Sequence, residues 1–377
     1  MIIKNAAVFQ EDGSFRIEDI FILNDRIVNS KDYYNASSKD EVLDAQGMYA
    51  IPGLTDIHFH GCFGHDFCEG TEKAFDAITA YEASQGITTL CPATMTLPEE
   101  TLAEIVRNFS DYPNDKGAIF CGINLEGPFL SVKKKGAQRE DYLRKPDVSM
   151  FLRLQELSGN RIKLVSIAPE EEGALDFIAA LKTKVVVSVA HTTINYEKAI
   201  EAFERGARHV THLFNAMPPF LHRDPGVIGA AFDTPDCRVE LICDGVHIHS
   251  SVIRAVFQMF GRDRVVMISD SMMATGIEDG IYTLGEQDVR VEGKVARLTT
   301  DGTIACSVTN LMDCLRYTVL EAGIPLETAV YAAAVNPAKV IGIDKDYGSI
   351  AVGKVANIVL LDKKLNTSAV ILKGNVI

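Results

Sequence analysis

Residues 55–64 read Thr-Asp-Ile-His-Phe-His-Gly-Cys-Phe-Gly and follow the apolar run Ala-Ile-Pro-Gly-Leu at residues 50–54. In an extended strand alternate side chains point to the same face, so the imidazoles of His58 and His60 are expected to project together. Two neighbouring imidazoles at the end of a strand can bind one divalent metal ion. Most His-x-His pairs hold no metal, so this pattern indicates a metal site only if further ligands occur at matching positions.

The composition limits the class of protein. The chain has 377 residues, 47% of them hydrophobic, which exceeds one ordinary domain and is enough for a large core. Its net charge of −14 argues against nucleic acid or an anionic membrane as main partner, and an anionic small substrate would need a local cluster of basic groups. The eight cysteines contain no CxxC pair, no signal peptide precedes them, and no apolar run approaches the ~20 residues of a membrane span. We therefore expect a soluble, cytoplasmic protein.

Both ends of the chain are rich in short alternating or β-branched apolar runs, separated by turns such as Asp12-Gly13 and Asn24-Asp25. This pattern predicts one small β domain assembled from both termini. The expected strands cover residues 1–9, 17–23, 26–28, 357–362 and 368–374.

Between these ends, strand-like runs alternate with helical patterns. Leu102, Ile105, Val106 and Phe109, for example, have the i, i+3, i+4, i+7 spacing of a helix. The eight strand-like runs are 54–60, 87–93, 118–125, 162–168, 185–190, 209–214, 238–243 and 265–269. This alternation predicts an α/β fold of the (β/α)8 barrel type. A doubly wound open sheet is the alternative, although no GxGxxG motif opens the first βα unit. Residues 288–291 and 295–298 are expected to form a hairpin.

Polar residues recur where these strands end, which is where chemistry occurs in such a barrel. The residues at or after the strand ends that can bind a metal or transfer a proton are His58, His60, Glu126, His191, His212, His247 and Asp270. Six of the eight strands have such a residue, although the chain has only nine histidines. Any one of them alone is more simply explained as a structural residue, but their common position indicates a metal-dependent active site.

The remaining polar groups are weaker indications. The run Lys133-Lys134-Lys135 is interpreted as a solvated loop rather than an anion site, unless the loop folds over a pocket. The cysteines, including Cys62 beside the histidine pair, are interpreted as small buried hydrophobic residues.

Several longer motifs point to a known family. They are Pro-Gly-Leu-Thr-Asp-Ile-His-Phe-His-Gly (52–61), Leu-Glu-Gly-Pro-Phe (125–129), Ala-His-Thr (190–192), Thr-His-Leu-Phe-Asn-Ala-Met-Pro (211–218), Asp-Gly-Val-His (244–247) and Ser-Asp (269–270). On these motifs the chain resembles the N-acetylglucosamine-6-phosphate deacetylases of the amidohydrolase superfamily over essentially its whole length. The second and fourth motifs are specific to this branch, whereas the His-x-His pair and the final Asp are shared more widely.

The resemblance implies a TIM-type (β/α)8 barrel over residues 53–343 and a small β-sandwich domain built from residues 1–52 and 344–377. It implies a homodimer in which each subunit binds one or two divalent cations (Zn, Fe, Mn or Co). The implied reaction is hydrolysis of the acetamide of N-acetyl-D-glucosamine 6-phosphate to D-glucosamine 6-phosphate and acetate, in amino-sugar catabolism.

The resemblance also implies roles for individual residues. Glu126, His191 and His212 would bind the metal, and Asp270 would act as catalytic acid and base. The expected substrate contacts are Ala137, Gln138, Asn215, Ala216, Arg223, His247, Ile304, Ala305 and Cys306. Among these, Arg223 is expected to reach the phosphate bound by the neighbouring subunit.

The chain has three features that set it apart within this family. Some relatives lack the His-x-His pair and hold a single metal, whereas His58 and His60 could hold a second. Gln138 stands where the single-metal relatives carry a His that polarises the substrate carbonyl, and Cys306 stands where a Gly is usual. We expect that a second metal, held by His58 and His60 and bridged through Glu126, takes over the polarising role.

Three other functions stay open at this point. A deacetylase of the galactosamine epimer would use the same chemistry. A cyclic amide hydrolase, such as a dihydroorotase or hydantoinase, typically bridges two metals with a carboxylated Lys at the fourth strand, where this chain has Ala168-Pro169-Glu170. A catalytically inactive scaffold would not need the complete ligand set or Asp270.

Overall fold

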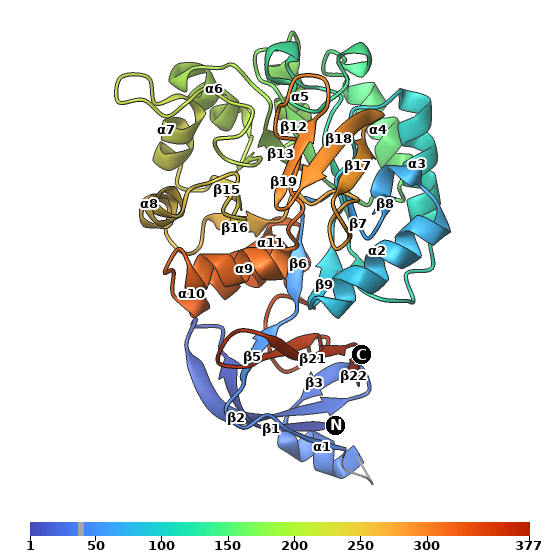
Figure 1. Ribbon diagram of the computed structural model, residues 1–377, viewed down its shortest axis with the longest axis vertical. Coiled ribbons are helices and arrows are strands. Elements are labelled where there is room, and N and C mark those ends of the chain that lie inside the picture. Colours follow the sequence, from blue (N-terminus) through green and yellow to red (C-terminus); the bar gives the residue numbers. More distant parts are fainter. Residues whose placement is uncertain (37–40) are drawn as a thin grey trace.

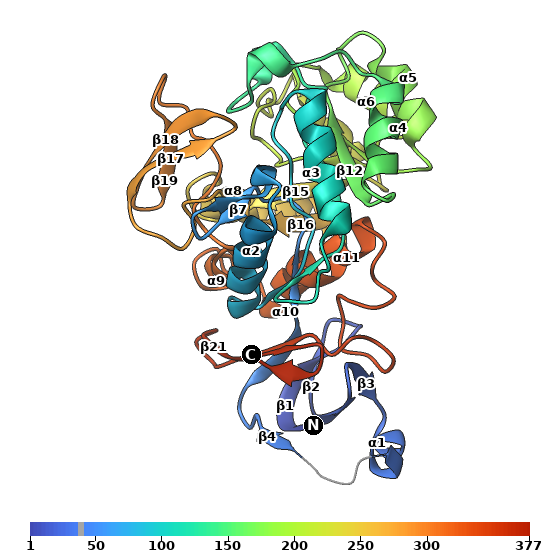
Figure 2. The same cartoon turned by 90° about the vertical axis from the view of Figure 1, so that its right-hand side faces the viewer.

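The computed structural model describes residues 1–36 and 41–377. Figures 1 and 2 show an α/β body with a smaller β lobe beneath it, and both termini lie in this lobe. None of the helices in these residues is long and apolar enough to cross a membrane.

The lobe contains one eight-stranded sheet in the order β22-β21-β20-β5-β1-β2-β3, with β4 beside β1. Its strands are β1 (Ile2–Phe9), β2 (Phe15–Leu23), β3 (Arg26–Val28), β4 (Val42–Asp44), β5 (Tyr49–Pro52), β20 (Ile358–Leu361), β21 (Thr367–Leu372) and β22 (Asn375–Val376). Strands β20 and β5 pair antiparallel, from Ile358 opposite Pro52 to Leu361 opposite Tyr49. Both ends of the chain thus share one sheet, while the domain boundaries at 52/53 and 343/344 stay predictions.

The lobe has its own hydrophobic core. In β1 a register shift between Ile3 and Ala6 brings Ile3, Ala6 and Val8 into the same core, which simple alternation would not do. Ile20 of β2 and Ile358 of β20 contribute to this core from the neighbouring strands.

The body alternates parallel strands with helices, as predicted. The strands form a three-stranded sheet, β10-β9-β6, and a six-stranded sheet in the order β11 to β16. They are β6 (Leu54–Asp56), β9 (Ile87–Leu90), β10 (Ile119–Phe120), β11 (Ile123–Leu125), β12 (Ile162–Ile167), β13 (Val186–Val189), β14 (His209–Val210), β15 (Arg238–Ile242) and β16 (Val265–Ile268). A short pair, β7 (Gly61–Cys62) and β8 (His65–Asp66), follows the first strand.

The helices are α1 (Ser30–Ala36), α2 (Glu72–Ser84), α3 (Glu99–Asp111), α4 (Val148–Leu157), α5 (Ala174–Leu181), α6 (Tyr196–Arg205), α7 (Gly226–Asp233), α8 (Ser250–Phe260), α9 (Leu311–Leu320), α10 (Leu326–Val330) and α11 (Asn336–Val340). Shorter turns of helix are η1 (Phe67–Glu69), η2 (Val132–Lys134), η3 (Glu140–Tyr142) and the π-helical η4 (Tyr331–Val335). The predicted helix around residues 102–109 is confirmed, because α3 buries Leu102, Ile105, Val106 and Phe109. The predicted hairpin is also confirmed as β18 (Gln287–Glu292) and β19 (Val295–Leu298), to which β17 (Gly280–Leu284) adds a third antiparallel strand.

Four predicted strands are wrong in extent. The second ends at Leu90 rather than at residue 93, and the sixth ends at Val210 rather than at residue 214. The first was expected to run to His60 but ends at Asp56, since the backbone N–H of His58 bonds to the Asp56 side chain, 3.1 Å away, rather than to a neighbouring strand. His58 and His60 therefore lie on a loop. The third breaks into β10 and β11, because β10 pairs with β9 whereas β11 pairs with β12.

Backbone contacts connect the two ends of the strand series. Asp270, which follows β16, donates its N–H to the carbonyl of His58 at 2.9 Å, and the N–H of His60 donates to the carbonyl of Ser271 at 2.7 Å. An isolated parallel bridge joins Ala93, which follows β9, to Asn124 in the middle of β11. These contacts hold the loop after β6 against the segment after β16.

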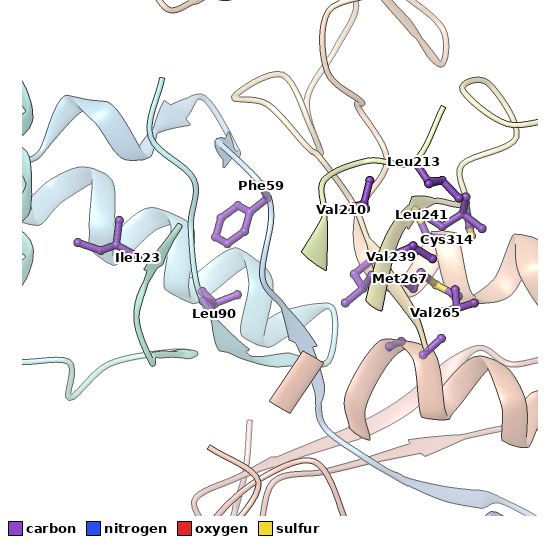
Figure 3. Packing of buried hydrophobic residues seen from close by; sticks show 14 of the residues in the cluster. Phe59, Leu90, Ile123, Val210, Leu213, Val239, Leu241, Val265, Met267 and Cys314 are labelled. Carbon is purple, nitrogen blue, oxygen red and sulfur yellow. The ribbon is translucent and has the colours of Figure 1, made fainter. Parts of the chain in front are cut away.

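The strands of the body are covered on both faces. Leu241 of β15 and Met267 of β16 lie in the large core together with Cys314 of α9 (Figure 3). Ile242 and Ile268, the next residues along the same strands, belong to a second buried cluster. Burial on both faces is the usual condition of parallel strands covered by helices, and each large side chain buried in this way contributes about 1.5–3 kcal/mol.

Among the described residues, the buried acids Asp56, Asp66 and Glu82 form no ion pair. Glu82 of α2 is 1% exposed and its Oε2 has no hydrogen-bond partner. Burial, together with the nearby carboxyl of Asp56, raises the pKa of Glu82 to about 8. Since the unfolded value is ~4.3, the folded protein holds the extra proton between these values, and its stability falls as the pH rises through this interval.

Replacing Glu82 by Gln should remove this pH-dependent loss. We expect the free energy of unfolding of Glu82→Gln, relative to the parent, to increase between pH 5 and pH 8 by on the order of 3 kcal/mol. Thermal unfolding at a series of pH values measures it. Glu104→Gln, on the exposed face of α3, is the control, and a parent–variant difference that does not change with pH would contradict the prediction.

Candidate metal and substrate site

A cavity of about 430 Å³ lies where the strands of the body end. The residues proposed from the sequence that line it are His60, Glu126, Ala137, Gln138, His191, His212, Asn215, Ala216, His247, Asp270, Ile304, Ala305 and Cys306. His58 is fully buried behind this lining. Arg223 is exposed and lies outside it, with its guanidinium 2.6 Å from the imidazole of His222.

Glu126, His191 and His212 converge at the centre of the cavity. Oε1 of Glu126 lies 3.1 Å from Nε2 of His191 and 3.2 Å from Nε2 of His212, and the two nitrogens are 3.0 Å apart. Nδ1 of His191 lies 2.8 Å from the carbonyl oxygen of Lys134, which can only accept, so Nδ1 donates. In the neutral ring the lone pair of Nε2 then faces the carboxylate, an arrangement that suits a cation between them.

His58 and His60 approach the same carboxylate from another side. Nε2 of His58 is 3.5 Å from Glu126 Oε1, and Nε2 of His60 is 3.4 Å from Glu126 Oε2. Each of these nitrogens also faces Oδ1 of Asp270, at 3.8 Å and 3.5 Å respectively. His58 Nε2 and Asp270 Oδ1 are buried without a hydrogen-bond partner. Buried polar atoms without partners are rare, so these two indicate a place for a cation.

The charges of the site compensate one another. Burial alone would raise the pKa of Glu126, but His58, His191 and His212 hold it well below its usual range. Burial opposes the charged form of His58, yet the carboxylates of Glu240 and Glu126 raise its pKa well above the usual value. The charged form of His58 that these carboxylates favour stands where a divalent cation would place its charge. Metal binding at this site should release protons.

Two histidines of the site are oriented by carboxylates to which the sequence analysis assigned no role. Oε2 of Glu240, on β15, lies 2.8 Å from Nδ1 of His58 and accepts a hydrogen bond from it. This bond directs Nε2 of His58 toward Glu126. Oδ2 of Asp244 lies 2.7 Å from Nδ1 of His247 in the same way. Glu240 stands in the run Arg-Val-Glu-Leu-Ile at 238–242, and a single acid inside an apolar strand was the available signal.

Residues 132–138 form a lid that folds over the cavity. Gln138 is 2% exposed; its amide Nε2 donates to Glu126 Oε2 at 2.9 Å and its Oε1 accepts from the N–H of Thr96 at 2.7 Å. Lys133, Lys134 and Lys135 line the cavity, with Lys133 exposed and the other two half-buried. The condition under which it would form an anion site, a loop folded over a pocket, is met. The run supplies the local positive charge that an anionic substrate needs in an acidic protein.

Three site residues adopt backbone conformations that L-amino acids rarely take. The φ angles are 43° at His191, 28° at His212 and 49° at Asp270. Such conformations cost on the order of 1–3 kcal/mol each and persist where the surrounding structure enforces them, often at functional sites. In each case the residue directly follows a strand or a short continuation of it, which turns its side chain into the cavity.

Comparisons with known proteins agree on one family. The amidohydrolase family model matches residues 49–377. The chain is 32% identical to the N-acetylglucosamine-6-phosphate deacetylase of Bacillus subtilis (strain 168), over 100% of this chain and 96% of that protein. It is 31% identical to the human protein of the same name, over 97% of this chain and 92% of that one. The solved structure of a mutant N-acetyl-D-glucosamine-6-phosphate deacetylase from Mycobacterium smegmatis, in complex with N-acetyl-D-glucosamine-6-phosphate, is similar with a TM-score of 0.92 and 32% identity, over 100% of this chain and 98% of that one.

The contact between Glu240 and His58 leads to a prediction about the protein without metal. Glu240→Gln removes the carboxylate nearest to His58, so the pKa of His58 should fall by at least about one unit. NMR titration of the histidine side-chain nitrogens in metal-free protein measures it. Glu69→Gln is the control. The carboxylate of Glu69 lies 3.1 Å from Nδ1 of His65, so this substitution should leave the pKa of His58 unchanged. An unchanged pKa of His58 in Glu240→Gln would show that this charge does not control the imidazole.

Proposed function

The chain belongs to the amidohydrolase family, and on that premise we propose that it hydrolyses the acetamide of N-acetyl-D-glucosamine 6-phosphate to D-glucosamine 6-phosphate and acetate, in amino-sugar catabolism. The observation that carries this proposal is the convergence of two carboxylates and three imidazoles on one cavity, with the imidazole of His58 directly behind them. These groups stand in a chain that aligns over its whole length with a deacetylase of that specificity.

We further propose that residues 53–343 form a closed (β/α)8 barrel, with the small β domain built from residues 1–52 and 344–377. The backbone bonds between Asp270 and His58 and between His60 and Ser271, which join the first strand to the last, support this proposal. So does the TM-score of 0.92 to the enzyme from Mycobacterium smegmatis.

For the metal, Glu126, His191 and His212 are the proposed ligands of a first divalent cation (Zn, Fe, Mn or Co). His58 and His60, with Glu126 shared, would hold a second. Each of these two groups of three residues offers ligand atoms that lie within 4.8 Å of one another. A bound divalent cation lowers the pKa of water from 15.7 toward ~7 and polarises a carbonyl group, and both effects favour attack on an amide.

Asp270 is the proposed proton carrier. Its carboxylate is buried beside the imidazoles, and although burial opposes ionisation, His60 and His58 lower its pKa to about 2, so it starts as a base. It accepts a proton from the attacking water and then transfers that proton to the nitrogen of the departing amine. Acetate and the free amino sugar are then released as separate products.

Substrate binding needs positive charge for the phosphate and polar contacts for the sugar. His247 is one candidate: burial opposes its charge, but Asp244 raises its pKa above the usual value, which favours the cationic form. Lys133–Lys135 are further candidates on the lid. Asn215, Ala216 and the turn at 304–306 line the remainder of the cavity and are the proposed sugar contacts.

A homodimer is part of the proposal, because Arg223 can contribute to a phosphate site only across an interface. It is exposed, lies outside the cavity of its own chain, and stands next to Phe220 and Leu221, two large hydrophobic residues that are about half exposed. An apolar exposed segment of this kind is suited to contact with a second subunit. A cytoplasmic location stays a prediction.

The proposed reaction is tested by acetate release. The protein should release acetate from N-acetyl-D-glucosamine 6-phosphate, and react poorly with the unphosphorylated sugar, which cannot use the cationic groups at the cavity. Turnover of N-acetyl-D-galactosamine 6-phosphate in the same assay distinguishes the epimeric alternative. Absence of turnover on either phosphate would favour the inactive scaffold.

Loss of the proton carrier should abolish turnover but not metal binding. Asp270→Asn keeps the shape of the side chain, and we expect its kcat to fall by a factor of at least ~10² while its metal content stays that of the parent. Elemental analysis and acetate release on the same sample measure both quantities. Near-normal turnover of Asp270→Asn would show that another residue carries the proton.

The proposed second cation is tested by metal stoichiometry. Protein purified without chelators should contain two metal ions per chain, and His60→Asn should contain one and lose at least about tenfold in kcat/KM. His65→Asn is the control, because His65 lies outside the cavity and contacts Glu69. A single metal in the parent, with activity unaffected by His60→Asn, would exclude a functional second ion.

A further inference from the structure

The function proposed above uses Cys306 only as part of the turn that contacts the sugar, and gives its thiol no chemical role. It lies in the turn between β19 and α9, and its neighbours hold it in place: the N–H of Ala305 bonds to the carbonyl of Ala296 at 3.1 Å, and the N–H of Ser307 bonds to that of Asp270 at 2.7 Å. The segment is thus tied to the strand end that carries Asp270. The backbone of Cys306 therefore stays close to Asp270.

The thiol lies among groups that can bind metal. His60, Asp270 and Cys306 each offer one ligand atom, and these three atoms lie within 4.8 Å of one another. The φ angle of Cys306 is 57°, a left-handed conformation that glycine adopts freely and that is unfavourable for a cysteine. The side chain is therefore present at a position where its backbone would favour glycine.

A second observation points to a cation at the same place. Oδ1 of Asp270 and Nε2 of His58 are both buried without a hydrogen-bond partner, and they face each other at 3.8 Å. Nε2 of His60 lies 3.5 Å from the same Oδ1. Two unpaired atoms and a third ligand atom thus lie close together, and the Sγ of Cys306 is within 4.8 Å of ligand atoms of His60 and Asp270.

We propose that the Sγ of Cys306 is a further ligand of the second cation, beside His58, His60 and Glu126. This inference rests on the proposed second metal and adds to it a sulfur donor. Thiolate sulfur binds Zn²⁺, Co²⁺ and Fe²⁺ in preference to Mg²⁺ or Mn²⁺, which prefer oxygen ligands. The second position should therefore select thiophilic ions, whereas the ligands Glu126, His191 and His212 of the first position contain no sulfur.

Cobalt(II) provides a direct measurement, because cobalt bound to thiolate absorbs in the near ultraviolet by charge transfer from sulfur. The parent chain, loaded with two equivalents of cobalt(II), should show this band. Cys306→Ser and Cys306→Gly should lose the band, and in competition experiments both should lose preference for Zn²⁺ over Mn²⁺ at the second position. Glycine fits the backbone angle at this residue, so loss of folding does not obscure the result.

Cys121→Ser is the matched control, since Cys121 is a free cysteine between β10 and β11 and outside the cavity lining. It should keep the band. A parent that binds two cobalt ions without the band overturns the sulfur ligand and leaves the two-metal proposal intact. A parent that binds one cobalt ion without the band overturns both. If the band survives both substitutions of Cys306, the sulfur ligand is another cysteine, and this result also overturns the inference.

Discussion

The carboxylate of Glu126 is the charge around which the site is built. It is 2% exposed, and a carboxylate buried to this extent is stable only if it is paired and hydrogen-bonded. Its partners are four imidazoles and the amide of Gln138, which come from the loop after β6, the ends of β13 and β14, and the lid. No two neighbouring segments can supply them, so the site exists only when the strand ends of the whole body converge.

The rigid scaffold holds this arrangement in spite of its cost. His191, His212 and Asp270 have positive φ angles, and acidic and basic groups are buried together. Each would be unstable on a mobile loop. Here strands buried on both faces precede them, and backbone bonds such as that from Asp270 to His58 hold them from the other side. The stability of the packed body thus compensates strain that the site requires for its chemistry.

Much of this architecture was predictable because it follows from local periodicity. The order of strands and helices, the apolar face of α3 and the hairpin at β18 and β19 all depend on patterns within a few residues. The errors occur where a local contact competes with the pattern. The bond from the His58 N–H to Asp56 ends the first strand early, and the change of partner between β10 and β11 breaks the third.

The sequence by itself determined which residue types follow the strands, and a common position at strand ends was enough to identify His60, Glu126, His191, His212 and Asp270 as candidates. Only the tertiary structure decided which atoms meet. It brings the carboxylate of Glu240 within hydrogen-bond distance of His58 and places the three lysines of the lid along the cavity. It also sets Cys306 beside His60 and leaves Arg223 outside the cavity. The physical reason is that distances between segments far apart in the chain are set by packing, which periodicity does not encode.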